Sequence, residues 1–294
     1  MSRKSLVSMI KGAKEKEVDY ATDFLSSLTY TIEKYNMDNK HMPSATFSPS
    51  SMKCDRQMIY KLLSVPIDNK KDSYQLVGIC ETGTARHEII QSYVNKMKDM
   101  SIDCEYINVA EYVREHKLPL KIGKESNFVD EFETHLYTKH DFGENNPFVF
   151  DSSFLCDGII KFKGKYFILE IKTQASMKAM RQTNVQEEHK AQATAYSLFL
   201  GINDVMFLYE DRDLLGKKCF IYSPTDEERS NLLKRLNSDW GLAMNKTICA
   251  KPNVDKKVCQ YCNYQMCRKT PAFRHGDIRY NKGKHIEKLV CRHN

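Results

Sequence analysis

The alternation of apolar and polar positions is clearest near the middle of the chain, where it predicts a β-hairpin. Two runs rich in Phe, Ile, Tyr and Leu, at 154–162 and 165–172, flank a short polar turn that contains Gly164. Runs of β-prone residues joined by a glycine turn are typical of antiparallel strands. The apolar stretch Tyr166–Leu169 indicates that the second strand lies inside the sheet.

Three charged residues interrupt this apolar hairpin. Side chains alternate along a strand, so Glu170 and Lys172 share one face while Ile171 points to the other. The hairpin can also bring Asp157 beside Glu170. Burying such charges costs free energy unless they are paired or bind a metal. We therefore expect two carboxylates and an ammonium group at one strand edge, with a salt-bridged surface strand as the alternative.

Helical periodicity occurs in the sequence both before and after the hairpin. Apolar residues three and four apart predict amphipathic helices, and N-cap residues, prolines and glycines mark their ends. Before the hairpin we expect helices over 18–36, from Ser48-Pro49-Ser50-Ser51 to Pro66, and over 82–98 after a Thr82-Gly83-Thr84 turn. After the hairpin we expect helices over 186–200, ending at Gly201, and from the Thr225 capping box to about 244. Two further strands are expected at 205–209 and 218–222.

This order of elements predicts the fold class and a division into three parts. Helices around a block of strands are typical of an α/β or α+β domain with a central mixed β-sheet flanked by helices. We expect an N-terminal helical extension at 1–45, a core domain at 46–248, and a cysteine-rich segment with a basic tail at 249–294.

The charge is concentrated at the C-terminal end. Of the net charge of +7, residues 251–294 contribute +8, from eleven Lys or Arg against three Asp or Glu. A basic segment on a near-neutral body suggests a polyanionic partner, most simply nucleic acid, with a solvated tail as the alternative. The sequence has no apolar run of the ~18 residues that a membrane span needs, and no signal-peptide core follows Met1, so we expect a cytoplasmic protein.

Cysteines cluster in the last segment. The spacing Cys259-x2-Cys262-x4-Cys267 predicts a metal site, because one short loop can wrap three thiolates around an ion or cluster. Two residues compete to be the fourth ligand. Cys249 would close a local site suited to zinc, and Cys54 would close a site across more than 200 residues. We interpret the cysteines in apolar surroundings as core residues: Cys80, Cys104, Cys156 and Cys219.

The paired carboxylates suit a hard cation such as Mg²⁺ or Mn²⁺. Held against a phosphodiester, the ion would polarise the phosphoryl oxygen and lower the pKa of a bound water. Lys172 would orient that water or stabilise the charge of the transition state. His87, on the inward face of its helix, and the i, i+4 pair Gln192 and Tyr196 are weaker candidates for the same site.

Taken in order, His87, Asp157, Glu170-Ile171-Lys172 and Gln192-x3-Tyr196 resemble the motifs of RecB-like PD-(D/E)XK nucleases, which have a restriction-endonuclease-like core. The cysteine set is similar to the iron–sulfur subgroup of that family, which includes CRISPR-associated RecB-like nucleases, AddB nuclease domains and exonuclease V. The resemblance covers roughly residues 46–270. It implies a deoxyribonuclease that cleaves single-stranded DNA or DNA ends as an exonuclease.

The resemblance also implies residue roles. Metal ligands would be His87, Asp157, Glu170 and the Ile171 carbonyl; Lys172 would be the catalytic lysine; Gln192 and Tyr196 would position DNA; and Cys54, Cys259, Cys262 and Cys267 would hold a [4Fe–4S] cluster. No phosphate-binding loop motif is present, so ATP-driven unwinding would need a partner such as a helicase. The rivals are a non-catalytic DNA-binding or adaptor protein on a nuclease fold, and the same nuclease with zinc in place of the cluster.

Overall fold

The structure is a computed structural model that describes residues 19–38, 47–65, 73–122, 136–141, 149–154 and 156–245, with Cys259, Cys262, Tyr264 and Cys267. The chain divides into two compact units, one formed by 1–41 with 69–81 and one by 42–68 with 82–294. In the first unit, α2 (Tyr20–Asp38) is an amphipathic helix, as the periodicity over 18–36 predicts. The expected boundaries at 45 and 249 stay predictions.

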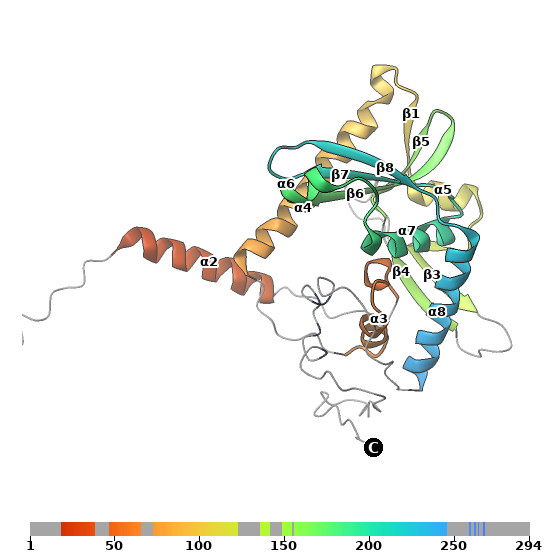
Figure 1. Cartoon of the computed structure of the whole chain (residues 1–294), viewed down its shortest axis with the longest axis horizontal. Helices are drawn as coiled ribbons and strands as arrows, with labels where there is room; N and C mark the ends of the chain where they lie inside the picture. The colour runs from red at the N-terminus through yellow and green to blue at the C-terminus, as the bar shows by residue number, and fades with distance from the viewer. Residues whose placement is uncertain are drawn as a thin grey trace, which may run out of the picture. The chain divides into compact units, whose positions relative to one another are not determined.

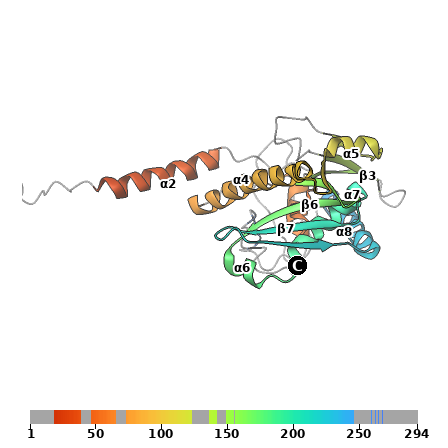
Figure 2. The same ribbon diagram turned by 90° about the horizontal axis from the view of Figure 1, so that it is seen from above.

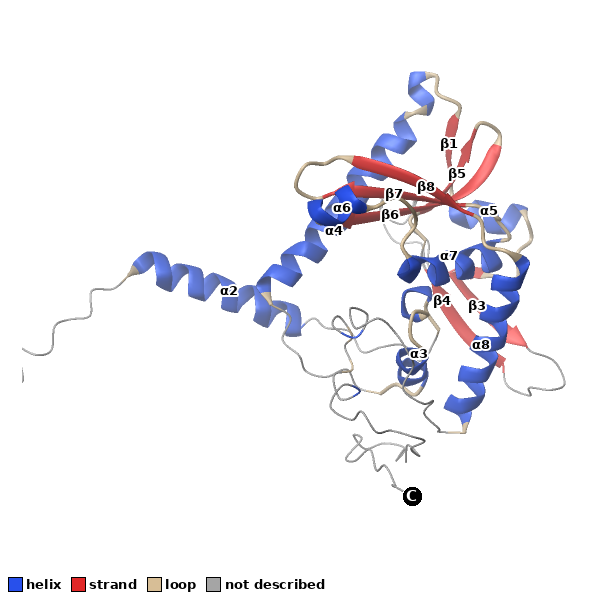
Figure 3. Cartoon of the chain, viewed as in Figure 1, coloured by secondary structure: helices blue, strands red, loops and turns tan. Residues whose placement is uncertain are grey.

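The described residues of the second unit form a central sheet of five strands in the order β1-β5-β6-β7-β8 (Figures 1 and 3). β6 and β7 pair in parallel and the other neighbours are antiparallel, so the sheet is mixed, as predicted. The strands are β1 (Cys104–Ile107), β5 (Gly158–Phe162), β6 (Lys165–Gln174), β7 (Val205–Asp211) and β8 (Lys217–Tyr222). This central mixed sheet flanked by helices is the mixed α/β fold class that the sequence predicts.

Helices cover both faces of the central sheet. One face packs into a large core with α7 (Glu187–Leu200), α8 (Asp226–Met244), α3 (Asp55–Leu62) and α5 (Val109–Glu115). The other face carries Ile160, Leu169 and Ile171, which pack with Ile90 of α4 (Tyr74–Lys96). Figure 2 shows α4 running alongside β6. The middle of β6 is therefore internal, which places Glu170 in a dry setting.

The hairpin of β5 and β6 has the predicted turn but a later start. Lys163 and Gly164 both adopt positive φ, at 49° and 78°, which is the two-residue turn that suits the twist of paired strands. The segment 154–162 is not one strand, because Phe154 ends β4 (Val149–Phe154) and β5 begins at Gly158. Asp157 consequently lies just ahead of its strand and not within it.

Two predicted helix starts are wrong. The Thr82-Gly83-Thr84 segment is not a turn, because α4 begins at Tyr74 and continues through it. A glycine costs a helix only about 1 kcal/mol relative to alanine, and the apolar residues before it extend the helical pattern. The helix expected from Ser48 to Pro66 is split: Pro49–Ser51 form a 3-10 turn, and α3 starts only after Cys54, its N-cap.

The C-terminal half of the core matches the prediction closely. α7 ends at Gly201, which takes the left-handed conformation of a helix C-cap. α8 starts with the predicted capping box, in which Thr225 and Glu228 satisfy each other's backbone N–H groups. The region 100–150 adds β1, α5, a 3-10 helix (Lys98–Met100) and a three-stranded sheet of β4 with β2 (Lys121–Ile122) and β3 (Leu136–Asp141).

The four cysteines expected in the core divide evenly. Cys104 and Cys156 are buried, whereas Cys80 and Cys219 are exposed, so the prediction is wrong for this second pair. Cys219 belongs to β8, which has a neighbour on one side only and alternates between exposed and half-buried positions. Cys249, Cys291 and the basic tail beyond Cys267 lie outside the described residues. Each helix of the described ranges is too short or too polar to cross a membrane.

Candidate active site

The candidate site lies where the pairing of β5 with β6 ends. The last pair is Gly158 with Leu169, and from Glu170 onward β6 pairs only with β7. At this open edge the Ile171 N–H donates to Asp157 Oδ2 over 2.6 Å. The N–H and C=O of one strand residue point to the same side, so the Ile171 carbonyl faces this edge as well. The hairpin thus brings Asp157 beside Glu170, as the sequence predicts.

The backbone of Asp157 is clamped from two other elements. Gln91 of α4 donates from Nε2 to the Asp157 carbonyl oxygen over 2.7 Å, and the Tyr106 hydroxyl of β1 donates to the same oxygen. The next residue, Gly158, has φ of +154°, and a Cβ there would meet Tyr106 Oη at 1.8 Å. Only glycine fits this position, because the absence of a side chain leaves room for Tyr106 to reach the Asp157 carbonyl oxygen.

His87 reaches Asp157 from α4, with Nδ1 lying 3.5 Å from Oδ1. Burial favours the protonated carboxyl group. The hydrogen bond and charge of His87, with the charge of Lys172, outweigh this effect, so the pKa of Asp157 lies below its usual value. Asp157 is therefore an ionised carboxylate at neutral pH.

Glu170 is the most deeply buried charged group of the site, with only 1 % of its surface exposed. Its Oε1 accepts from Lys172 Nζ and, over 2.9 Å, from Gln192 Nε2. Its Oε2 is buried and has no hydrogen-bond partner among the described residues. Burial is the main cause that raises the pKa of Glu170 to about 7, and the charge of Asp157 adds to it. Glu170 Oε2 is thus a buried carboxyl oxygen that the described residues leave without a hydrogen bond.

Lys172 stays charged although its side chain is half-buried. Burial lowers the pKa of its ammonium group, but the charges of Glu170 and Asp157 more than offset this, so the pKa lies above its usual value. Gln192 also donates to the Tyr196 hydroxyl over 2.9 Å. Both residues thus belong to the network behind Glu170, on one stripe of α7. Their predicted role in positioning DNA stays a prediction.

His189 lies one turn before Gln192 and is held neutral. Its Nδ1 is 2.9 Å from the Tyr209 hydroxyl, and its ring stacks on Phe207 and Tyr209. Burial, followed by the nearby charges of Lys172, Lys178 and Lys53, lowers the pKa of His189 to about 3. A neutral ring adds no positive charge to a site that already holds Lys172.

The donor set at the open edge fits a hard divalent cation. Carboxylate and carbonyl oxygens are the preferred ligands of Mg²⁺ and Mn²⁺, and an imidazole is an accepted addition. The orphaned Glu170 Oε2 is the observation that supports this fit. Within the described residues no three His, Cys, Asp or Glu side chains already stand in the geometry of one metal site. Binding would require the side chains to converge from their present positions.

Three of the predicted thiol ligands, Cys54, Cys262 and Cys267, lie around α3, although no three thiols of the described residues stand in the geometry of one metal site. Cys54 caps this helix, and burial, followed by the charges of Cys262 and Cys267, raises the pKa of its thiol to about 11. Arg56, buried in the first turn, donates from Nη1 to Cys267 Sγ over 3.4 Å. Tyr264 packs edge-on against Tyr60, with Cys262 and Cys267 beside them. Cys259 is joined to Cys262 by a backbone hydrogen bond of 3.3 Å.

Sequence reasoning missed the residues that hold the site in place. Arg86 of α4 makes a bidentate ion pair with the fully buried Glu210 of β7, over 2.6 and 2.9 Å. This pair holds α4 against β7 at the position next to His87. Gln91 follows His87 by four positions, and this i, i+4 spacing was the one available signal. Nothing in the local sequence marks Tyr106 or Glu210.

No family model and no curated protein matches this sequence. Among solved structures, a protein named SSO0001 aligns with a TM-score of 0.47 and 15% identity, covering 81% of this chain and 95% of that one. An alkaline exonuclease from Laribacter hongkongensis aligns at 0.37 and 11%, covering 74% and 93%. Candida albicans Rai1, in complex with pU5 and Mn²⁺, aligns at 0.26 and 11%, covering 74% and 66%. None of these TM-scores reaches 0.5, so they do not identify the function of this chain.

Proposed function

We propose that this protein is a metal-dependent DNA nuclease that hydrolyses phosphodiester bonds, acting as an exonuclease on single strands or ends. The observation that carries the proposal is the buried Glu170, whose Oε2 lacks a partner beside an ionised Asp157 and a charged Lys172. A structural ion pair would satisfy both carboxylate oxygens, because an unpaired buried acceptor costs about 1–3 kcal/mol. An oxygen left open is suited to a ligand.

Asp157, Glu170, the Ile171 carbonyl and His87 would hold Mg²⁺ or Mn²⁺. When bound, the ion would polarise a phosphoryl oxygen and lower the pKa of a water. Lys172 keeps a fixed positive charge near the place where the phosphate gains negative charge. Gln192 holds Glu170 Oε1, so that Oε2 keeps its direction. Gln91 and Tyr106 fix the backbone of Asp157 from the far side.

The test is cleavage of labelled single-stranded DNA with Mg²⁺, with Mn²⁺, and with EDTA. We expect metal-dependent cleavage that increases between pH 6 and 8, because a cation must displace the proton that Glu170 holds with a pKa of about 7. Strands blocked at the 5′ or 3′ end, and circular strands, distinguish an exonuclease from an endonuclease. Binding of DNA without cleavage under any of these conditions would instead support the non-catalytic adaptor.

We further propose that Cys54, Cys259, Cys262 and Cys267 hold a structural [4Fe–4S] cluster. Two observations support this proposal. The charges of Cys262 and Cys267 add to burial in raising the pKa of the Cys54 thiol, and the buried Arg56 lies at Cys267 Sγ, where its positive charge would offset that of thiolates. Such a cluster would join α3 to the last segment of the chain. The zinc alternative uses Cys249 in place of Cys54.

Metal content distinguishes the iron–sulfur cluster from the zinc alternative. We expect protein purified without oxygen to be brown, to absorb near ~400 nm and to contain iron and sulfide. Cys54→Ser should remove most of the iron and lower stability, whereas Cys80→Ser, a change at an exposed cysteine, should leave both unchanged. A colourless protein with one zinc that survives Cys54→Ser would contradict the cluster.

A further inference from the structure

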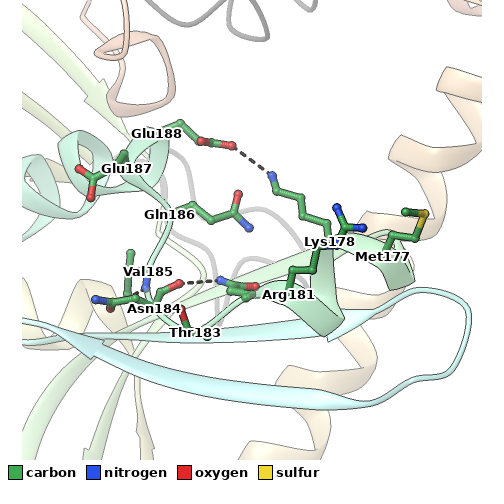
Figure 4. A pocket seen from close by; sticks show the side chains of 10 residues that line it. Met177, Lys178, Arg181, Thr183, Asn184, Val185, Gln186, Glu187 and Glu188 are labelled. Carbon is green, nitrogen blue, oxygen red and sulfur yellow. Dashed lines mark hydrogen bonds and ion pairs between the residues drawn. The ribbon is translucent and has the colours of Figure 1, made fainter.

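An open groove of about 720 Å³ lies at the end of β6, between α6 (Ser176–Arg181) and the first turn of α7. Three of the residues that line it lie on α6, and the others lie on the loop to α7 and its first two residues. In Figure 4 an ion pair between Lys178 and Glu188 spans the space between the two helices, and Gln186 extends into that space. A volume of this size is typical of small-molecule and nucleotide sites.

The groove continues the row of side chains that forms the candidate active site. Residues two apart on a strand share one face, so Gln174 follows Glu170 and Lys172 on the same side of β6. Gln174 donates to the Gln182 side chain and accepts from Gln186 Nε2 over 2.8 Å, and both partners line the groove. Gln174 lies about 6.6 Å along the strand from Lys172. A ligand that spans both places therefore has to be extended.

The loop 182–186, which forms part of the wall opposite α6, is held by hydrogen bonds from several elements. Lys218 of β8 donates to the carbonyl oxygens of Gln182 and Met180 over 2.8 and 3.1 Å. The Gln182 amide donates to the Asn184 carbonyl over 3.1 Å, and the Gln186 N–H donates to the Tyr209 hydroxyl over 3.3 Å. Since these bonds come from β7, β8 and the loop itself, the groove is built into the fold.

The two walls of the groove have opposite chemistry. The α6 wall carries Lys178 and Arg181, and the opposite wall carries amides and the carboxylates Glu187 and Glu188. Lysine and arginine suit phosphate, whereas amide and carboxylate groups suit the edges of unpaired bases, whose amino groups they can accept from. A single nucleic-acid strand presents phosphates on one side and bases on the other, which matches this division.

We propose that this groove binds the single strand next to the bond being cleaved, with its phosphates along α6 and its bases toward the 182–188 wall. The proposal rests on the nuclease function and names how that site would hold its substrate. The Lys178–Glu188 pair is about half exposed at both ends, so it contributes little stability and opens readily. An incoming phosphate takes the place of Glu188 beside Lys178.

The test measures binding of a fluorescent single-stranded oligonucleotide in EDTA, which stops cleavage, over a range of salt concentrations. Each phosphate contact on a single strand contributes a slope of about 0.7 in log affinity against log salt, which corresponds to roughly fivefold at 0.1 M. We expect Lys178→Ala and Arg181→Ala each to weaken binding by about this factor and to reduce the slope accordingly. Glu188→Gln should tighten binding at low salt, because it frees Lys178.

The matched control is Lys98→Ala, which breaks an exposed pair with Glu105 of β1, and neither residue lines the groove. Strand binding in the groove is contradicted if the α6 variants show the wild-type slope of log affinity against log salt. It is also contradicted if Lys98→Ala weakens binding as much as the α6 variants do. The two proposals fail separately. A wild type that binds through the groove but cleaves no nucleic acid refutes the nuclease, and one that cleaves while the α6 variants keep their affinity refutes the groove.

Discussion

Lys172→Ala is expected to lower the rate of DNA cleavage by about 10²-fold or more, the usual cost of losing a group that stabilises transition-state charge. The Lys172 ammonium is bound to Glu170 Oε1 and is kept charged by both carboxylates of the site. Among the described residues, no other lysine or arginine forms an ion pair with Glu170 or Asp157. The measurement is single-turnover cleavage with Mn²⁺ at saturating enzyme.

The reason for this loss can be separated from loss of the metal. Removing Lys172 leaves two carboxylates without their cation, so Mn²⁺ should still raise the melting temperature of the variant. Asp157→Ala removes a proposed ligand, and we expect it to abolish both cleavage and this stabilisation. Lys161→Ala changes a lysine on the neighbouring strand that lies over the Tyr166 ring, away from the carboxylates, and should cleave normally. Undiminished cleavage by Lys172→Ala and Asp157→Ala would refute the proposed site.

Arg86→Ala is expected to lower the free energy of unfolding by about 3 kcal/mol. Glu210 is fully buried on β7, and its carboxylate accepts two hydrogen bonds from Arg86 and forms an ion pair of 2.9 Å with Lys217. Removing one partner leaves an incompletely compensated charge in the core. The loss falls at the lower end of the range for buried pairs because Lys217 remains. Urea denaturation followed by circular dichroism measures it.

Two comparisons make the Arg86 prediction specific. The double variant Arg86→Met with Glu210→Gln removes the buried charge along with its partner, so it should recover a large part of the lost stability. Lys98→Ala breaks an exposed pair and should cost less than about 1 kcal/mol. A loss for Arg86→Ala no larger than that of Lys98→Ala would show that the Arg86–Glu210 pair does not hold α4 to the sheet.

Local patterns predicted the elements that carry the site. Strand alternation placed Glu170 and Lys172 on one face and Ile171 on the other, and the structure has this arrangement. Glycine and capping signals predicted the β5–β6 turn, the end of α7 and the start of α8. These features depend on residues a few positions apart, so the sequence contains the information that fixes them.

The same local reasoning failed where distant segments decide the outcome. The break before α3 and the early start of α4 were missed. A proline marks where a helix can begin but not how far it runs, and one glycine costs a helix only about 1 kcal/mol. Cys80 and Cys219 were placed in the core from their apolar neighbours, yet both are exposed. The apolar character of a segment does not reveal which of its faces is covered.

The residue types of the candidate site and their order along the chain can be read from the sequence, because strand and helix periods set the faces on which these residues lie. The surroundings of these residues depend on the tertiary structure. It showed that Asp157 accepts a hydrogen bond from the open edge of β6, and that one oxygen of Glu170 has no hydrogen-bond partner among the described residues. It also showed that Arg86, Gln91 and Tyr106 stabilise the site through contacts from α4 and β1. Burial and hydrogen bonding between segments far apart in the chain arise only on folding, and they set the charges of the site.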